Sequence, residues 1–448
     1  MARFLPPQYN KQNVDFYMKK AFFIVISIVF IANLGAQKLK TKDVLSSLVQ
    51  DERFQYGQQI SQFAKGLKYD MPIIKKVEAR FGINGNANGD TIYGNIRNED
   101  FYGLVLSTNS LREIKKQKEF KTAQVGALES ETRVTLQQAL FDRYLTLVTL
   151  NFTQDLKAKR QNLNILLDKK HSVLSDMLDK GLDTKIKDVL DTENDKNTLQ
   201  LAVSELENAV QFQTNKIKQY LLSDALPTLD YADFIPISKI TEVINAQKMT
   251  QSLNPIIDYR NAQNKLASAN FEVEMAQNRQ IFSFVQVAYQ NPILELETPN
   301  KQKSVNNFSV RFGLTVPITG NNNFKKSETA LQLRDAQNDY QLAIKTNQKA
   351  IDIQYVKVEN LLKQYELCND RIEQSLIKKM LKNDKLLAQI TPLEILELQI
   401  TQHKLELRAI EIAHEITSEY VRLLDLTGAL SAKPYKNYLS KNLESFEF

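Results

Sequence analysis

The chain has 448 residues, of which 25% are charged, and it contains 13 glycines, 11 prolines, no tryptophan and one cysteine, Cys368. A single cysteine excludes an internal disulfide and argues against a thiolate metal cluster. Without residues 1–36 the chain has 54 basic and 51 acidic residues, so its formal net charge falls from +6 to +3. The basic residues are interspersed with acidic ones, which argues against a nucleic-acid-binding protein.

The first 36 residues have the pattern of a secretory signal peptide. Met18-Lys19-Lys20 precedes an apolar run over 21–32, and the small residues of Leu34-Gly35-Ala36 follow it. This pattern predicts a signal segment over 1–36 with cleavage after Ala36, and Met18 as a second possible start. The apolar run is shorter than the ~20 residues of a spanning helix, so an uncleaved anchor is the less favoured alternative.

Helix-breaking residues are segregated along the chain. No proline occurs between Pro72 and Pro227, and between Leu104 and Phe312 only two glycines occur. This distribution predicts long uninterrupted helices joined to short, glycine-bearing strands. In the first half we expect a helix over 41–67, strands over about 73–83 and 101–107, a long helix over 111–180, and a return helix over 184–222 with Asp183 or Thr184 as its N-cap.

The second half repeats this plan after a connector over 226–252. We expect a helix from Asn254-Pro255 to about Gln280, strands over about 281–289 and 308–317, a long helix over 324–386, and a return helix over 391–428. Thr391 would be the N-cap of the return helix and Pro392 its first helical residue. The tail after Lys433 is polar, and we expect it to be loosely held.

The segment 308–317 has the clearest strand pattern. Phe308, Val310, Phe312, Leu314 and Val316 alternate with polar or small residues, which predicts a strand with one apolar face. If the strand spans a membrane, these five residues face lipid and Arg311 faces a wet interior. The partner strand is weaker, because Gln286 interrupts one face and Ser283 the other.

Two pairs of similar segments indicate an internal duplication. Tyr102-Gly103-Leu104 matches Phe312-Gly313-Leu314 at an offset of 210 residues, and Asp188-Val189-Leu190-Asp191 matches Glu394-Ile395-Leu396-Glu397 at an offset of 206. The two matches occur in the same order and at nearly the same offset, which predicts a duplicated unit of roughly 200 residues. We place the first repeat at 37–235, the second at 236–430, and the C-terminal tail at 431–448.

The signal segment, the duplicated order of elements, the strand 308–317 and the paired DVLD and EILE turns resemble the TolC-like outer-membrane efflux proteins. The resemblance covers about Thr41 to Leu430. It implies a fold that is mainly α with a small β part, in which three copies each give four strands to one 12-strand outer-membrane β-barrel that continues into a periplasmic α-helical barrel. The physics agrees, because four strands cannot close a membrane barrel and open edges are excluded from lipid. The first hairpin departs from the family pattern, since Ser107-Thr108-Asn109 contains no proline.

The resemblance also implies a function and its site residues. The chain would be a channel subunit that passively conducts small molecules or exported protein, working with a periplasmic adaptor and an inner-membrane transporter of the RND or ABC class. The turns between long and return helices would form the periplasmic tip, with Gly181, Leu182, Thr391 and Pro392 as adaptor contacts. By position Asp188, Glu394 and Glu397 would be gate carboxylates. Alternatively, these acids are only favoured by the helix macrodipole in the first turns of their helices.

Two other functions compete with the channel. One is the periplasmic adaptor of such a system, although adaptors carry one helical hairpin and this chain has two. The other is a soluble coiled-coil scaffold of the envelope, for which the alternation over 308–317 would be accidental. His171, His403 and His414 are dispersed over predicted helices, so we expect no metal site. No nucleophile–base pair or cofactor motif occurs, and we expect neither a cofactor nor enzymatic activity.

Overall fold

The protein is described from a computed structural model, in which the chain forms two compact units. One unit contains residues 1–55, 136–252 and 350–448, and the other contains residues 56–135 and 253–349. The structure describes residues 39–67, 72–86, 97–182, 184–223, 229–247, 254–278, 282–292, 307–314, 321–381 and 390–447. The predicted signal segment, Asp183 and Val316 therefore lie outside the described residues.

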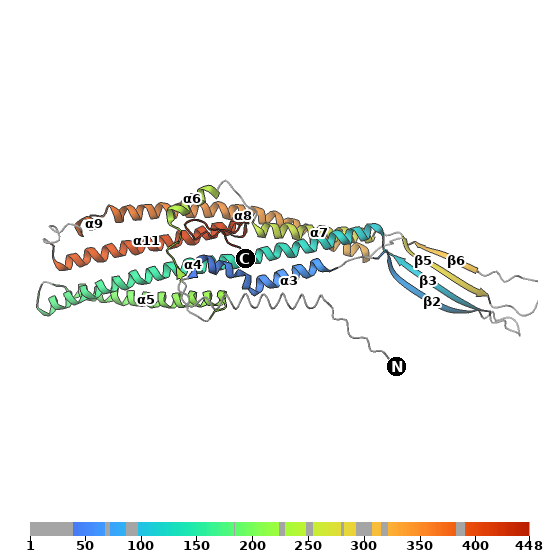
Figure 1. Ribbon diagram of the computed structural model, residues 1–448, viewed down its shortest axis with the longest axis horizontal. Coiled ribbons are helices and arrows are strands. Elements are labelled where there is room, and N and C mark those ends of the chain that lie inside the picture. Colours follow the sequence, from blue (N-terminus) through green and yellow to red (C-terminus); the bar gives the residue numbers. More distant parts are fainter. Residues whose placement is uncertain are drawn as a thin grey trace, which may run out of the picture. The chain divides into compact units, whose positions relative to one another are not determined.

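The chain is mostly helical with a small sheet part, as predicted (Figure 1). The first half contains, in order, β1 (Leu39–Lys40), α2 (Thr41–Ser46), η1 (Ser47–Gln50), α3 (Glu52–Gly66), β2 (Ile74–Asn86), β3 (Arg97–Thr108), α4 (Leu111–Asp179) and α5 (Ile186–Leu221). The second contains β4 (Leu229–Asp230), α6 (Ile237–Gln247), α7 (Pro255–Asn278), β5 (Phe282–Pro292), β6 (Asn307–Leu314), α8 (Asn321–Glu373), α9 (Leu376–Leu381), α11 (Pro392–Leu426) and η2 (Ala429–Ser431). The same order of elements thus occurs twice, namely a short strand, helices, two longer strands, a long helix and a return helix.

The expected single helix over 41–67 is wrong, because the chain is interrupted at Asp51. This residue has an extended backbone, and its Oδ1 accepts hydrogen bonds from the N–H groups of Arg53 (3.1 Å) and Phe54 (3.4 Å) at the start of α3. Its Oδ2 accepts from the guanidinium of Arg143 at 3.1 Å. The Arg143 side chain is only 2% exposed and lies over the ring of Tyr220 at 4.5 Å. A buried cation requires a partner, so Asp51 both caps α3 and neutralises Arg143.

The expected continuous helix over 324–386 is also wrong. Helix α8 ends at Glu373, and α9 begins at Leu376. Between them the hydroxyl of Ser375 accepts a hydrogen bond from the N–H of Ile377 at 3.1 Å. A serine hydroxyl that accepts a hydrogen bond from a nearby backbone N–H favours the start of a new helix over continuation of the preceding one. The helix break therefore has a local cause, the side chain of Ser375.

The tail is not loosely held, contrary to expectation. Asn437 donates to Thr41 Oγ1 at 2.8 Å, and the carbonyl of Leu439 accepts from the N–H of Ile235 at 2.8 Å. Tyr144 of α4 donates its hydroxyl proton to the carbonyl of Lys436 at 2.7 Å and accepts from the N–H of Tyr438 at 3.2 Å. The lysines made this segment look polar, but Asn437, Tyr438, Leu439 and Phe446 are buried.

The connector over 226–252 contains a helix that we did not predict from the sequence. Helix α6 begins directly after Pro236 and buries Ile240, Val243 and Ile244. These apolar residues recur at spacings of three and one, which is the pattern of one buried helix face. The connector is therefore part of the folded core of the first unit.

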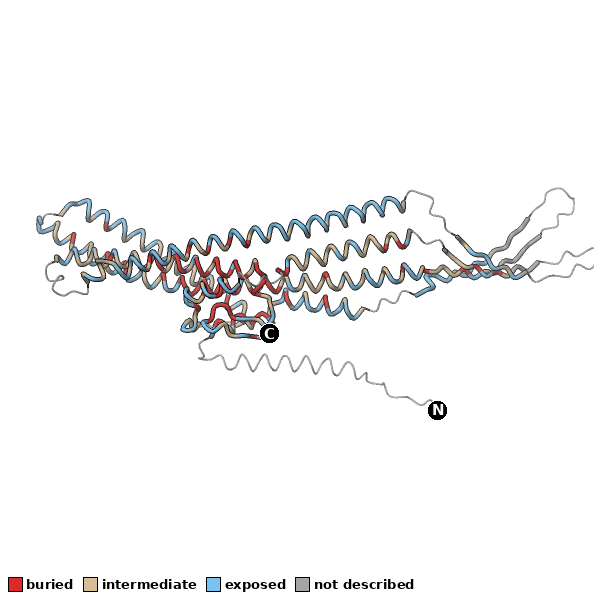
Figure 2. Tube along the Cα trace, turned by 90° about the horizontal axis from the view of Figure 1, so that it is seen from above, coloured by how far each residue is buried: buried red, intermediate tan, exposed pale blue. Residues whose placement is uncertain are grey.

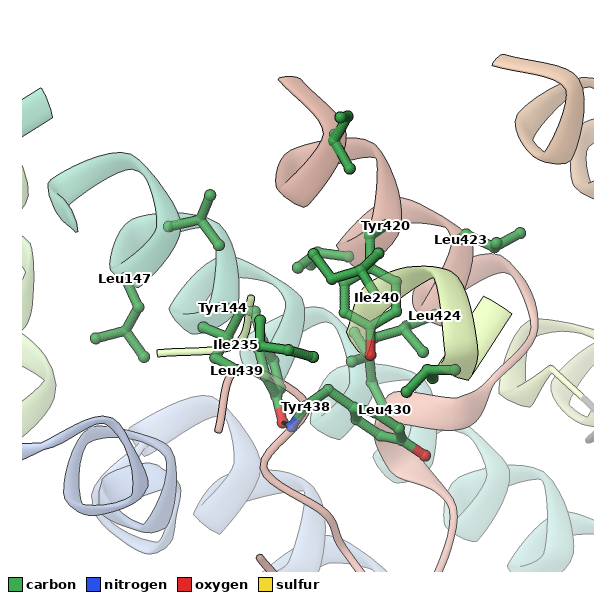
Figure 3. Packing of buried hydrophobic residues seen from close by; sticks show 14 of the residues in the cluster. Tyr144, Leu147, Ile235, Ile240, Tyr420, Leu423, Leu424, Leu430, Tyr438 and Leu439 are labelled. Atoms are coloured by element: carbon green, nitrogen blue, oxygen red, sulfur yellow. Dashed lines mark hydrogen bonds between the residues drawn. The ribbon is translucent and has the colours of Figure 1, made fainter. Parts of the chain in front are cut away.

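The core of the first unit forms where α4, α6, α11 and the C-terminal segment meet (Figures 2 and 3). Burial of these side chains supplies most of the apolar stabilisation of the unit. The side chains that converge in Figure 3 include Tyr144, Leu147, Ile235, Ile240, Tyr420, Leu423, Leu424, Leu430, Tyr438 and Leu439.

We expect Leu439→Ala to destabilise the first unit. The Leu439 side chain is 0% exposed, and replacing a buried leucine by alanine costs about 2 to 5 kcal/mol. Unfolding by denaturant, followed by helical circular dichroism, measures the effect. Lys436→Ala is the matched control, since that side chain is exposed and only its backbone carbonyl binds Tyr144. Equal stability of the two variants would contradict the docked tail.

Candidate functional site

The four strands form one antiparallel sheet in the order β2-β3-β5-β6 (Figure 1). Paired residues of neighbouring strands lie directly opposite one another, so their side chains form rows that cross all four strands. One face of the sheet is apolar over three consecutive rows of paired residues. It is formed by the rows Phe81-Tyr102-Tyr289-Phe308, Ala79-Leu104-Val287-Val310 and Val77-Leu106-Val285-Phe312.

The apolar face is exposed rather than buried. Phe81 and Phe308 are 74% and 72% exposed, whereas Val105 and Ala288 on the opposite face are buried. Water-soluble proteins rarely present a contiguous apolar surface of this kind, which marks a membrane or protein interaction site. Of the residues expected to face lipid, Phe308, Val310 and Phe312 lie on this face. The side chain of Leu314 and the whole of Val316 lie outside the described residues.

The opposite face carries the polar side chains. Glu78, Val105, Gln286 and Arg311 form one row across the sheet, and Arg80 on the same face pairs with Glu78 at 3.0 Å. Arg311 therefore lies on the face opposite to the apolar one, as the alternation predicted. No described helix has an 18-residue stretch apolar enough to cross a membrane.

A β-bulge explains the weak alternation of the third strand. The pairing of β5 with β6 shifts between Phe282 and Phe284, so Ser283 falls at the irregularity and the alternation restarts after it. Phe284 then lies on the same face as Gln286, against Gly313 of β6. A Cβ atom at position 313 would collide with the Phe284 ring, which accounts for glycine at this position.

The first of the two inter-helix turns contains Gly181 and Leu182. The N–H of Gly181 donates to the carbonyl of Leu178 at 3.0 Å, and the N–H of Leu182 donates to the carbonyl of Met177 at 2.9 Å. Gly181 has φ +67, so this is a Schellman termination of α4. Both residues are exposed. Helix α5 has Lys185 as its N-cap, not Thr184, and Asp188 is exposed in its first turn.

The second inter-helix turn is held by a capping box at the start of α11. The N–H of Glu394 donates to Thr391 Oγ1 at 3.3 Å, and Glu394 Oε2 accepts from the Thr391 N–H and hydroxyl, both at 2.8 Å. The predicted roles of Thr391 as N-cap and of Pro392 in the first turn are confirmed. The Thr391 N–H, and then its hydroxyl, hold the pKa of Glu394 below its ordinary value.

The third candidate gate acid, Glu397, is engaged by another helix. Its carboxylate lies 2.9 Å from the ammonium of Lys170 on α4. Further along the same two helices Lys159 pairs with Glu406 at 2.7 Å. The sequence did not predict these contacts, because the partners are far apart in the chain. Glu394 and Glu397 thus share the start of α11, while Asp188 lies on α5, and the structure shows no bond from Asp188 to either acid among the described residues.

The histidines and the cysteine do not gather at the tip. His171 lies on α4, His403 and His414 lie on α11, and Cys368 is buried on α8. Within the described ranges no three His, Cys, Asp or Glu side chains converge as a cation site.

The sequence matches no protein-family model and no curated protein, but solved structures match most of the chain. The outer membrane protein VceC of Vibrio cholerae has 10% identity and a TM-score of 0.57, over 87% of this chain and 96% of that one. The CmeC outer membrane channel of Campylobacter jejuni has 14% identity and a TM-score of 0.52, over 86% and 83%. The open state of the MtrE outer membrane channel of Neisseria gonorrhoeae has 14% identity and a TM-score of 0.56, over 90% of each chain.

Identities this low show the fold alone. The chain has the fold of these outer-membrane channels, and the resemblance inferred from the sequence is confirmed at that level.

The capping box makes the start of α11 sensitive to acid. Because the pKa of folded Glu394 is lower than the unfolded value of 4.5, its stabilisation is present above that pH and is lost as the pH falls through the folded pKa. We expect faster amide exchange in the first turn of α11 under acid, after correction for intrinsic rates. Glu394→Gln keeps the box without a charge and should remove this pH dependence. An unchanged pH dependence in that variant would refute the assignment.

Proposed function

We propose that this chain, which has the fold of the TolC-like outer-membrane efflux channels, is the channel subunit of a tripartite efflux or secretion system. It passively conducts small molecules or exported protein from a periplasmic adaptor and an inner-membrane transporter of the RND or ABC class to the outside. The observation that carries the proposal is the exposed apolar face of the four-stranded sheet. The chemistry of that face fits the hydrocarbon of a bilayer.

The sheet requires other copies of the chain if it lies in lipid. Its outer strands are β2 and β6, and each presents backbone groups on its free side. Hydrocarbon offers these groups no hydrogen bonds, so only a closed barrel is stable there. Three copies arranged as a homotrimer give a 12-strand barrel, which exceeds the minimum of about eight strands in bacterial barrels. The helices then continue into the periplasm as an α-helical barrel.

The duplicated plan and the N-terminal segment are consistent with this assignment. Residues 1–36 would direct the chain across the inner membrane as a signal peptide. The repeats over 37–235 and 236–430 would each supply one hairpin to the barrel and one helical pair to the periplasmic part. The repeated order of elements in the structure supports the duplication, although the short strand β4 precedes residue 236.

The gate of the proposed channel is the ring of carboxylates at the tip. In a trimer Asp188, Glu394 and Glu397 each occur three times, and ionised carboxylates in a narrow aperture favour cations and repel one another. In this structure Lys170 neutralises Glu397 and the capping box holds Glu394. The Lys170–Glu397 pair must therefore break before Glu397 adds its charge to the aperture.

The adaptor would bind at the two turns beside the gate. Gly181 and Leu182 form one exposed turn, and Thr391 with Pro392 forms the other. Both turns are held by local hydrogen bonds, so they present fixed shapes to a partner at little entropic cost.

Two neighbouring substitutions test the lipid-facing surface. Val310 lies on the apolar face and Ser309 on the opposite one. We expect Val310→Lys to reduce the amount of assembled protein in the outer membrane, because a lysine on the lipid face of a barrel costs about 2 to 4 kcal/mol at mid-depth. Ser309→Lys should leave much more assembled protein. Both are measured as the fraction that resists alkaline carbonate extraction, and equal fractions would contradict a lipid-facing role for this face.

A further inference from the structure

Basic residues gather where the sheet meets the helices, in the unit that contains residues 56–135 and 253–349. The segments 72–76, 109–118 and 321–328 together contain eight basic and two acidic residues, whereas the two kinds nearly balance over the whole chain. Six of the eight form what we call the basic cluster, and all six side chains are exposed: Lys75, Arg112, Lys115, Lys118, Lys325 and Lys326.

The starts of β2 and α4 are held together at this end of the sheet. The side-chain amide of Asn109 donates to the carbonyl of Pro72 at 2.9 Å. The backbone N–H of Asn109 donates to the carbonyl of Ile73 at 2.8 Å. Lys75 at the start of β2 and Arg112 at the start of α4 therefore lie at the same end of the sheet.

The start of α8 lies at the same level. Lys116 of α4 lies 3.6 Å from Glu272 of α7, and Arg260 of α7 pairs with Asp339 of α8 at 3.3 Å. Helix α7 leads into β5 and α8 follows β6, so the two helices run antiparallel. Moving 12 residues forward on α7 and 12 residues back on α8 brings Glu272 level with Ser327. The first turns of α4 and α8 are thus level to within about one turn.

The acidic residues nearby are already engaged. Glu113 is buried, and it accepts a hydrogen bond from the side chain of Gln277 at 3.1 Å. Glu119 and Glu272 both pair with Lys116, which is not part of the cluster. Over the described ranges no carboxylate lies within ion-pair distance of the six cluster side chains. The charge of the cluster is therefore not neutralised within one chain.

Helix stability does not explain the cluster. The N-terminus of a helix carries a partial positive charge, so basic side chains in its first turns are unfavourable. Helix α8 has no acidic residue in its first turn, and Lys325 and Lys326 follow directly. These residues do not serve the helices themselves, which points to an anionic partner outside the chain.

The exposed apolar face of the sheet continues into the cluster. Ile74 pairs with Thr108, which lies two residues after Leu106 and so on the same face. At the helix starts Leu111 and Phe324 are 76% and 73% exposed. Lysine and arginine side chains beside such residues lay their apolar stems on them and extend their charges toward water. This arrangement is typical of the boundary between hydrocarbon and headgroups.

We propose that the basic cluster binds the phosphate groups of anionic phospholipids, whose acyl chains lie on the apolar face of the sheet and on Leu111 and Phe324. The proposal rests on the membrane-spanning sheet of the proposed function and identifies the lipid class at its border. In that assignment the helices lie in the periplasm, so these lipids belong to the periplasmic leaflet.

Charge distinguishes anionic phospholipids from zwitterionic ones. A phosphatidylcholine headgroup carries its own cation beside the phosphate, whereas phosphatidylglycerol has a net negative charge that the cluster can neutralise. Each basic side chain near an anionic lipid surface contributes roughly fivefold in affinity. The cluster therefore predicts a clear preference for phosphatidylglycerol.

Competition between two lipids tests this preference. The tagged full chain is purified as a trimer in a non-ionic detergent that contains equal amounts of dioleoylphosphatidylglycerol and dioleoylphosphatidylcholine, and the retained lipids are measured by mass spectrometry. We expect phosphatidylglycerol to be enriched. The double variants Lys325→Gln with Lys326→Gln, and Lys115→Gln with Lys118→Gln, should each lower the enrichment at least about threefold.

The matched control is the double variant Lys345→Gln with Lys349→Gln. Both side chains are exposed on the same helix α8, and Lys345 lies about 30 Å from Lys325 along it. This variant removes the same charge and should keep the enrichment. Lys325→Arg with Lys326→Arg should keep it as well, because the positive charges remain.

A change of salt distinguishes a lipid headgroup from a free anion. Sodium phosphate in place of sodium chloride, at the same ionic strength, should leave the enrichment unchanged, because inorganic phosphate has no acyl chains to bury. Displacement of the lipid by inorganic phosphate would show a site for free anions and would overturn the lipid assignment.

The remaining outcomes separate the lipid site from the channel. An intact heat-sensitive trimer without enrichment, or with equal loss of enrichment in the Lys345 and Lys349 control, overturns the lipid site and leaves the proposed channel intact. Absence of a trimer from the unsubstituted chain overturns the proposed function as well.

Discussion

A sheet with open edges and an exposed apolar face constrains everything else in this protein. The face formed by rows such as Phe81-Tyr102-Tyr289-Phe308 is unfavourable in water, and the free edges of β2 and β6 are unfavourable in hydrocarbon. A single chain cannot both keep its apolar face out of water and keep its free strand edges out of hydrocarbon. The proposed assembly of several copies around a closed barrel would resolve them together, because it would leave the apolar face in lipid and pair every edge.

The helices pose the same problem in a milder form. A long helix such as α4, with 69 residues, extends over about 104 Å, more than one compact core can cover. Leu201 of α5 and Leu367 of α8 stay exposed in a single chain. The docked C-terminal segment, in contrast, completes a core that the chain covers by itself.

Local patterns were predictable from the sequence, and distant partners were not. The period-two alternation around Phe312 and the capping chemistry of Thr391 depend on neighbouring residues, so both could be predicted. The bend at Asp51 depends on Arg143, which lies 92 positions away in the chain. The buried tail depends on Tyr144, and the neutralisation of Glu397 depends on Lys170. No periodicity reports such contacts, which explains why the resemblance could propose Glu397 as a gate acid but the sequence did not predict its ion pair with Lys170.

The most direct test of the central claim is the assembly of the full chain in the outer membrane of a Gram-negative host. The membranes are separated, and the outer-membrane fraction is run in detergent with and without heating. An oligomer with the mass of three chains that dissociates on heating is the predicted result, because a closed barrel holds its strands by a continuous hydrogen-bond network. A monomer that mild salt releases from the membranes would contradict the channel and favour a soluble envelope protein.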